Sequence, residues 1–323
     1  MVISEKKSYA IQLMRGVAII AVVCIHNVPY AAPQVFCRPF LNFSVGLFIF
    51  LSGMLSNASY WKPWKRIKKV LIPYLIWTAV YVVFSNYKTP LLIPMNYIWD
   101  LLTGQSSAIM YYIFVYIQFT LLIPLIDRIA KSKFKYWGFI ISPLEIIIMR
   151  LVPLVIGVKM NEYLQIVISV SCLGWFSYFY LGYLLGNGLL KFSISKKKLQ
   201  MMLFIAFVLQ IIEGYWYYTM GNWNCGTQLK LSSILTGCLF SVLVYLYIES
   251  EQCNECKLLY LFGECSFGIY FSHLAIMSIL SKIPHYGEFV IYPINAVVAL
   301  SISLGFVLLS RRIFGKYSKY LAL

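Results

Sequence analysis

The chain has 323 residues, of which 61% are hydrophobic and only 12% are charged. So few charges cannot cover the surface of a water-soluble globule of this size, which excludes an ordinary soluble domain. The formal net charge of +16 would suit a nucleic-acid partner, but the basic residues lie in short runs between long apolar blocks. That pattern is typical of the loops of membrane proteins, so we expect membrane lipid, and no nucleic acid, as a partner.

Ten segments are long and apolar enough to cross a bilayer, which takes about 20 mostly apolar residues. The sequence therefore predicts an all-α, polytopic membrane helical bundle of about ten transmembrane helices. The fifth segment is interrupted by two prolines, by Glu145 and by Arg150, and the sixth is long enough to tilt or protrude. The predicted spans are 11–29, 42–60, 70–86, 108–127, 137–156, 163–190, 199–218, 229–249, 259–281 and 290–311.

The charges of the connections predict the orientation of the bundle. With the N-terminus inside, 20 of the 27 Lys and Arg residues fall in inner segments and five, including Arg38, in outer loops. Both termini are therefore expected to be cytoplasmic. Arg15 interrupts the approach to the apolar core of a possible signal peptide, and Pro33 after Ala31 and Ala32 disfavours cleavage, so we expect an uncleaved first span. Residues 1–323 are expected to form a single membrane domain.

Three smaller features predict structure rather than chemistry. The connection at 87–107 is expected to be an ordered loop or a short interfacial helix. Gly182, Gly186 and Gly188 have a spacing that favours close helix packing. Most of the eight cysteines lie in apolar stretches, and the lone pair Cys253 and Cys256 has no second ligand pair for zinc, so we expect no metal site.

Arg15 and His26 are the strongest candidates for chemistry, because both lie in the first span. Eleven residues are about three helical turns plus 20°, so the two side chains share one face, with a rise of roughly 16 Å between them. Taken alone, Arg15 could reach the inner interface and His26 could be a hydrogen-bonded packing residue. One polar face instead favours one cavity lined by both, since a charged Arg in a span normally faces a protein interior or water.

Four segments, in order along the chain, resemble the acyltransferase-3 family of integral membrane O-acyltransferases. RGVAIIAVVCIH (15–26) is similar to its R-x10-H signature, and VGLFIFLSGM (45–54) to its F-F-x-L-S-G-F segment. KRIKKVLIPYLIW (65–77) resembles its basic run before P-Y-x-x-W, and GECSFGIYFSH (263–273) its G-x-x-S-[YF]-x-I-Y-x-x-H. The chain departs from the family at Met54, where an aromatic is usual, and at 112–118, which lack the His and Trp of its H-x-W-F-L segment.

The resemblance implies transfer of an acyl group, most often acetyl, from a cytoplasmic acyl-CoA to a hydroxyl of an extracytoplasmic glycan or glycolipid, in a bacterial inner membrane. Acyl-CoA would be a co-substrate, and no tightly bound cofactor is expected. The physical properties of the two residues agree with this. Nucleotide phosphates near Arg15 would bring the thioester at the end of the pantetheine arm close to His26. His26 would be the general base that takes the proton of the attacking hydroxyl.

The remaining candidates are assigned to binding of substrate or acyl-CoA, each with a structural alternative. His273, with Tyr270 one turn before it, could instead form a hydrogen bond between helices. Ser52 and Gly53 could serve helix packing, and Arg66 could serve only to set topology. Glu145 and Arg150 are five residues apart, which does not bring them together on an α-helix, so they are expected to pair with other helices or line the cavity. Trp216, Tyr217, Tyr218 and Trp223 could stack on sugar rings near an outer opening.

Two other functions compete with the enzyme. A transporter or flippase for a polysaccharide or small solute would use the same polar face as its path, but such proteins often contain internal repeats and none is found here. A scaffold without catalytic activity would leave the polar face unexplained. The sequence leaves open the acceptor, the acyl chain, whether a covalent acyl-enzyme forms, and the oligomeric state.

Overall fold

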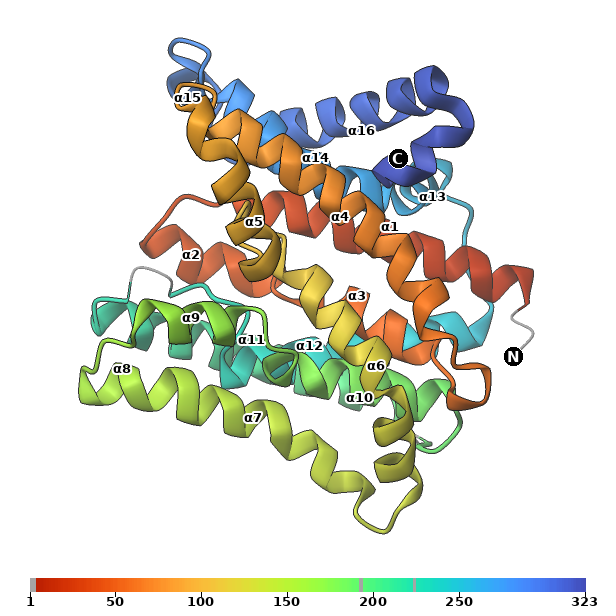
Figure 1. The fold of residues 1–323 in the computed structure, drawn as a ribbon. Helices are drawn as coiled ribbons and strands as arrows, with labels where there is room; N and C mark the ends of the chain where they lie inside the picture. The colour runs from red at the N-terminus through yellow and green to blue at the C-terminus, as the bar shows by residue number, and fades with distance from the viewer. Residues whose placement is uncertain (1–3, 192–193, 223–224) are drawn as a thin grey trace.

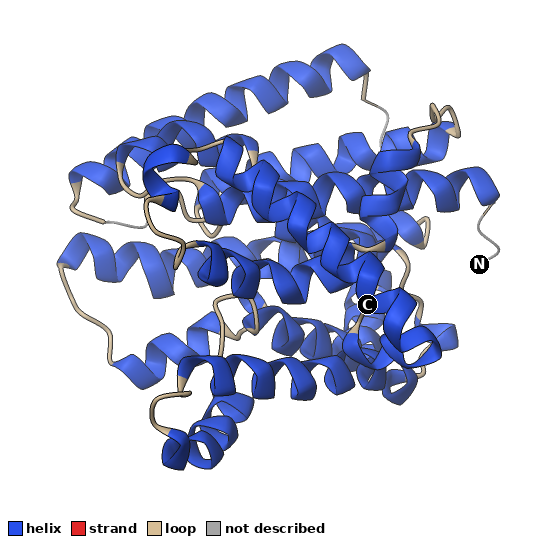
Figure 2. Cartoon of the chain, turned by 90° about the horizontal axis from the view of Figure 1, so that it is seen from above, coloured by secondary structure: helices blue, strands red, loops and turns tan. Residues whose placement is uncertain are grey.

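The computed structural model describes residues 4–191, 194–222 and 225–323. Within these ranges every regular element is a helix, and no strand is formed (Figure 2). A bilayer offers no hydrogen bonds to an exposed backbone, and a helix satisfies its backbone groups internally. The all-α class predicted from the sequence is confirmed.

The described chain contains nine helical segments that are long and apolar enough to cross a membrane, and a bent pair of helices that makes a tenth if it is one span. The first five crossings are α1 (Glu5–Asn27), α2 (Ala32–Cys37) with η1 (Arg38–Phe40) and α3 (Phe43–Met54), α4 (Pro63–Ser85), α6 (Tyr111–Lys131), and η4 (Lys135–Ile140) with α7 (Ile141–Ile146), η5 (Ile147–Leu151) and α8 (Val152–Ile156). The second five are α9 (Glu162–Ser169) with η6 (Leu173–Trp175) and α10 (Phe176–Gly186), α11 (Lys196–Thr219), α12 (Leu231–Ser250), α13 (Lys257–Glu264) with α14 (Ser266–Leu280), and α16 (Ile294–Phe314) with η7 (Gly315–Leu321). The short helices η2 (Ala58–Tyr60), η3 (Pro90–Leu92), α5 (Ile93–Thr103) and α15 (Tyr286–Phe289) lie in connections. The prediction of about ten spans is confirmed.

In Figure 1 the N-terminal end of α1 and the C-terminal end of α16 point to the same side of the bundle. Which side faces the cytoplasm stays a prediction from the loop charges.

The second crossing begins about ten residues earlier than its hydropathy predicts. α2 starts at Ala32, with Pro33 in its first turn, and η1 joins it to α3. Proline is well tolerated in a first turn because the N–H that it lacks would have no partner there. Arg38 therefore lies inside the second crossing, and its assignment to an outer loop was wrong.

The ninth crossing is not one straight helix, as the sequence predicted, but α13 and α14 bent by 77° at Cys265. Both halves pack on α1. α13 approaches α1 so closely that a Cβ on Gly263 would lie 2.0 Å from the backbone oxygen of Gln12, and one on Gly16 would lie 2.1 Å from that of Leu259. The bend lets both halves follow α1 while α14 also contacts α16.

The centre of the bundle is formed by α1, α3, α10 and α12, with α7 and α8 at one edge of the view in Figure 1 and α16 at the other. α3 and α10 cross at glycine contacts. A Cβ on Gly182 or Gly186 would lie 2.1 Å from the backbone oxygen of Phe50 or Met54, respectively. The predicted packing role is confirmed for these two. Gly188, whose φ is +68° and whose Cβ would meet nothing within 4 Å, follows the end of α10 instead.

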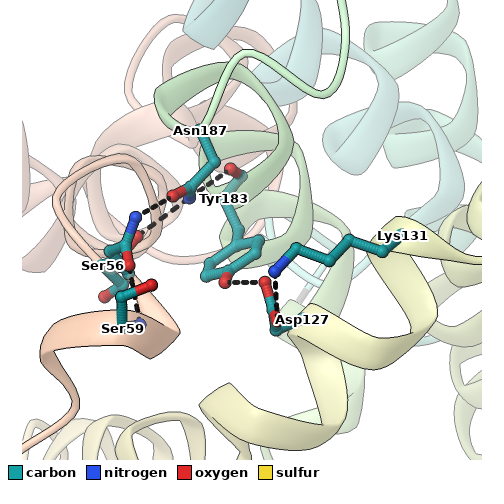
Figure 3. Close-up of polar contacts among 7 residues, drawn as sticks. Ser56, Ser59, Asp127, Lys131, Tyr183 and Asn187 are labelled. Carbon is teal, nitrogen blue, oxygen red and sulfur yellow. Dashed lines mark hydrogen bonds and ion pairs between the residues drawn. The ribbon is translucent and has the colours of Figure 1, made fainter.

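A polar cluster ties together the ends of α3, α6 and α10 (Figure 3). The Tyr183 hydroxyl donates to Asp127 Oδ1 at 2.6 Å, and Lys131 pairs with the other oxygen of that carboxylate at 2.7 Å. Asn187 donates to the backbone oxygens of Ser56 and Tyr183 at 2.9 and 2.8 Å. These bonds fix how far α3 and α10 can slide along each other.

The connection at 87–107 contains α5, as predicted for a short helix. The Tyr74 hydroxyl contacts the backbone oxygens of Asp100 and Leu101 at 3.0 and 2.9 Å, which attaches the C-terminal end of α5 to α4. Gly104 ends the helix with a φ of +70°, a left-handed conformation that glycine adopts without strain.

Candidate functional site

One cavity lies beside the first half of α1 and has a volume of about 330 Å³. We name it the inner cavity, and its neighbour the outer cavity, after the orientation that the loop charges predict. Two basic side chains, Arg15 and Lys69, line it together with the phenol rings of Tyr112 and Tyr116. Arg15 is half-buried and forms no ion pair with any described residue. Tyr112 and Tyr116 are four residues apart on α6, so both rings face the same way.

The outer cavity begins near the end of α1 and has a volume of about 260 Å³. Its wall contains His26, two arginines and a pair of aromatic rings. The arginines are Arg38 from η1 and Arg150 from the π-helical turn η5. The rings are those of Tyr111 and Trp175, stacked with centroids 6.0 Å apart.

Val45 and Tyr270 line both cavities, so the two are neighbours separated by these side chains. The Tyr270 hydroxyl donates to the backbone oxygen of Ile109, which holds the ring in place. Arg15 and His26 therefore face adjoining cavities on one side of α1. The sequence predicted a single cavity, and the structure corrects this to two cavities that share a wall.

His273 lies next to His26, with the ring centroids 5.3 Å apart. Its Nδ1 is 2.9 Å from the backbone oxygen of Ile269, and since a carbonyl only accepts, Nδ1 carries the proton. In the neutral ring Nε2 is then an acceptor, and it is buried with no hydrogen-bond partner among the described residues. His26 is half-buried, and neither of its ring nitrogens bonds to a described residue.

Glu145 and Arg150 form an ion pair with each other, Oε1 to Nη2, at 3.3 Å. The prediction that residues five apart would not meet was wrong because this stretch includes the π-helical turn η5. A π-helix bonds residue i to i+5, which brings side chains five apart onto one face. The pair leaves Glu145 Oε2 and Arg150 Nε buried and without a partner among the described residues.

A family model described as an acyltransferase domain matches residues 8–312, nearly the whole chain. The chain belongs to the acyltransferase-3 family. Neither a curated protein nor a solved structure matches it. Family membership and the ten candidate crossings make the chain a multi-pass membrane acyltransferase.

Three residues predicted to contact substrate in this acyltransferase lie away from the two cavities. A Cβ on Gly53 would lie 2.1 Å from the backbone oxygen of Phe179, so Gly53 serves helix packing. Ser52 is half-buried, and its carbonyl accepts a hydrogen bond from Ser56 at 2.6 Å. Arg66 donates to the Ser56 hydroxyl at 2.8 Å and lines a separate pocket between the ends of α3 and α10.

Arg66 still approaches the inner cavity, because its guanidinium carbon is 5.9 Å from the ring centroid of Tyr116, which lines that cavity. Tyr116 thus stands between Arg66 and the inner cavity. Lys69, from the same basic run as Arg66, lines the cavity itself, so it can bind a ligand as well as set the topology. Its position in the basic run before the third span cannot tell a residue that binds a ligand from one that only sets the topology.

The described aromatic residues that the sequence offers for stacking on sugars do not line either of the two cavities. Tyr217 is buried, whereas Trp216 and Tyr218 are exposed, and Trp223 lies outside the described residues. The aromatic wall of the outer cavity comes instead from Tyr111 and Trp175, on α6 and η6. Among the described residues no group of three His, Cys, Asp or Glu side chains is placed to hold a metal ion.

Proposed function

We propose that the acyltransferase moves an acyl group, acetyl in the simplest case, from cytoplasmic acyl-CoA to a hydroxyl of a carbohydrate acceptor on the outer side. The observation that carries the proposal is the pair of adjoining cavities, with Arg15 in the wall of one and His26 in the wall of the other. Such an arrangement suits a donor and an acceptor that arrive from opposite sides of a membrane.

The inner cavity is the proposed site of the donor. Arg15 and Lys69 supply two cations, and guanidinium and ammonium groups both bind phosphate oxygens. The pantetheine arm would then cross the shared wall at Tyr270, which requires that ring to move aside, over a distance comparable to the roughly 16 Å rise from Arg15 to His26. Its thioester would end beside His26.

The proposed reaction is a direct acyl transfer. A lone pair on the acceptor hydroxyl attacks the thioester carbonyl carbon as His26 takes the hydroxyl proton. The carbon–sulfur bond then breaks, the sulfur leaves with the electron pair, and the proton passes from His26 to the sulfur, giving an ester and free CoA. His273 Nε2, a buried acceptor next to His26, would stabilise the protonated imidazole by accepting a hydrogen bond from it.

The aromatic wall supports a carbohydrate acceptor. The stacked rings of Tyr111 and Trp175 offer an apolar face, and Gln228 offers an amide with its Oε1 buried and unpaired among the described residues. A sugar ring has apolar C–H faces and hydroxyl edges, so it matches a wall of this composition.

The test compares two histidine variants of the full chain. His26→Ala should lower transfer by roughly 10²- to 10⁴-fold, the usual contribution of a general base. His285→Ala is the matched control, because His285 is exposed and pairs with Glu288 at 3.1 Å, outside both cavities. Cells in which each variant replaces the wild type are assayed for base-labile acetate in the envelope glycan, and purified protein in nanodiscs is assayed for consumption of labelled acetyl-CoA.

Equal acetylation by folded His26→Ala and by wild type would exclude His26 as the base. If purified wild type consumes no thioester with any envelope glycan, the proposed acyl-CoA donor is wrong.

A further inference from the structure

Arg38 is a half-buried cation that has no counter-ion in the described chain. Among the described residues its guanidinium forms one hydrogen bond, from Nη1 to Gln34 Oε1, which is long at 3.4 Å, and its Nε is buried without a partner. A guanidinium removed from water without a carboxylate partner costs free energy. An oxyanion bound beside the guanidinium would supply the missing charge.

The acidic residues of the surrounding elements are already engaged. Glu145 pairs with Arg150, and the two oxygens of Glu213 accept hydrogen bonds from the backbone N–H groups of Leu231 and Ser232 at 3.2 and 2.9 Å. The residues that line the outer cavity include no Asp or Glu. The cavity therefore presents Arg38 and Arg150 with no carboxylate in its wall.

The position of Arg38 is built into the fold. A Cβ on Gly226 would lie 2.5 Å from Arg38 Cδ, so the absence of a side chain there makes room for the arginine. Asn42 Nδ2 donates to the backbone oxygen of Gly226 at 3.2 Å, which ties this loop to the start of α3. The aliphatic part of the Arg38 side chain is thus fixed in place, while the N–H groups of the guanidinium remain available to a ligand.

We propose that Arg38 and Arg150 form an oxyanion subsite in the outer cavity, which binds a carboxylate or phosphate carried by the acceptor saccharide. Planar guanidinium groups bind such oxyanions with two parallel hydrogen bonds. This deepens the proposed function, because the acceptor becomes an acidic glycan rather than a neutral one. The apolar rings of Tyr111 and Trp175 would hold the sugar while the two arginines hold its charge.

The test measures binding, which does not depend on acyl transfer. Purified full-length protein in nanodiscs is titrated calorimetrically with glucuronate-containing oligosaccharides, with the same oligosaccharides after reduction of the carboxylate to an alcohol, and with a phosphorylated oligosaccharide. Wild type should bind a charged member at least tenfold more tightly than its neutral counterpart. Arg38→Gln should lose most of that preference, roughly ten- to hundredfold in affinity.

Two further variants keep the test decisive. Lys159→Gln removes one positive charge from an exposed residue beyond α8 and should retain the full preference. Arg38→Lys keeps the charge but loses the paired geometry, so an intermediate preference is expected. Equal affinities for charged and neutral glycans in wild type, or a preference that survives Arg38→Gln, would overturn the proposal.

Donor assays separate two sources of the oxyanion. If the acceptor carries it, Arg38→Gln leaves the ratio of acetyl-CoA to succinyl-CoA consumption unchanged. If the ratio shifts away from succinyl-CoA, the subsite serves the acyl group and the assignment to the acceptor is wrong. An equal loss of rate with charged and neutral acceptors, without loss of binding, would instead assign Arg38 to the transition state and overturn the proposal.

Discussion

Replacing Gly182 with Ala tests whether the α3–α10 crossing depends on the absence of a side chain. The new Cβ would lie 2.1 Å from the backbone oxygen of Phe50, whereas ordinary contacts begin near 3.4 Å. The obstacle is backbone, which cannot rotate away as a side chain can, so the helices must separate by about 1.3 Å.

The expected cost follows from two opposing effects. Overpacking of a dense interior costs roughly 1–3 kcal/mol, and contact with backbone puts this site at the upper end. Alanine regains about 1 kcal/mol over glycine within a helix. The net loss in the free energy of unfolding is about 2 kcal/mol, which lowers Tm by roughly 3 °C for a chain of this length.

Gly305→Ala is the matched control for this substitution. Gly305 also lies within a long helix, α16, but a Cβ there would meet nothing within 4 Å. The same chemical change should leave stability unchanged or raise it by up to about 1 kcal/mol. Both proteins are melted in one detergent and followed by intrinsic fluorescence. If Gly182→Ala melts at or above the temperature of Gly305→Ala, the inferred backbone contact does not limit packing.

Three further predictions address charge, hydrogen bonding and catalysis. Burial, helped by the nearby charge of Arg38, lowers the pKa of Lys230 to about 8 from 10.5. Between pH 8 and pH 10.5 the unfolded chain therefore keeps a proton that the folded state has released, so the folded state gains stability as the pH rises. The Tm of wild type should therefore rise relative to that of Lys230→Met from pH 8 to 10.5, and a constant difference would contradict this. Tyr183→Phe removes the 2.6 Å hydrogen bond to Asp127 and should lower the free energy of unfolding by roughly 1–3 kcal/mol, measured by chemical denaturation. An unchanged denaturation midpoint would show that this hydrogen bond does not stabilise the fold. His273→Ala should lower kcat roughly ten- to hundredfold with little change in KM for acetyl-CoA, and an unchanged kcat would remove it from the reaction.

Hydropathy predicted the crossings well because each of them follows from local composition. A run of about 20 apolar residues has to be helical in lipid wherever it lies in the bundle. The helical period also agrees with the structure, in which Arg15 and His26 of α1 line two adjoining cavities.

The predictions that were wrong concern features that depend on contacts with neighbouring helices or on irregular backbone. The bend at Cys265 arises where α13 and α14 both pack on α1, which no property of 259–281 alone reveals. The Glu145–Arg150 pair depends on a π-helical turn, and a prediction that assumes the α-helical period cannot find it. Arg38 was missed because a charge next to Pro39 resembles a loop, although the structure places it in the wall of a cavity.

The shared wall at Tyr270 bears on how the cell keeps its ion gradients. A bilayer holds protons and ions apart only while no hydrated path runs through it, and here two cavities adjoin within the bundle. Between the two cavities the barrier to ions consists of the side chains that line both, which are Val45 and Tyr270, whose hydroxyl is bonded to the backbone oxygen of Ile109. A substitution that shortens the Tyr270 side chain would therefore let protons and ions leak across the membrane, in addition to any effect on acyl transfer.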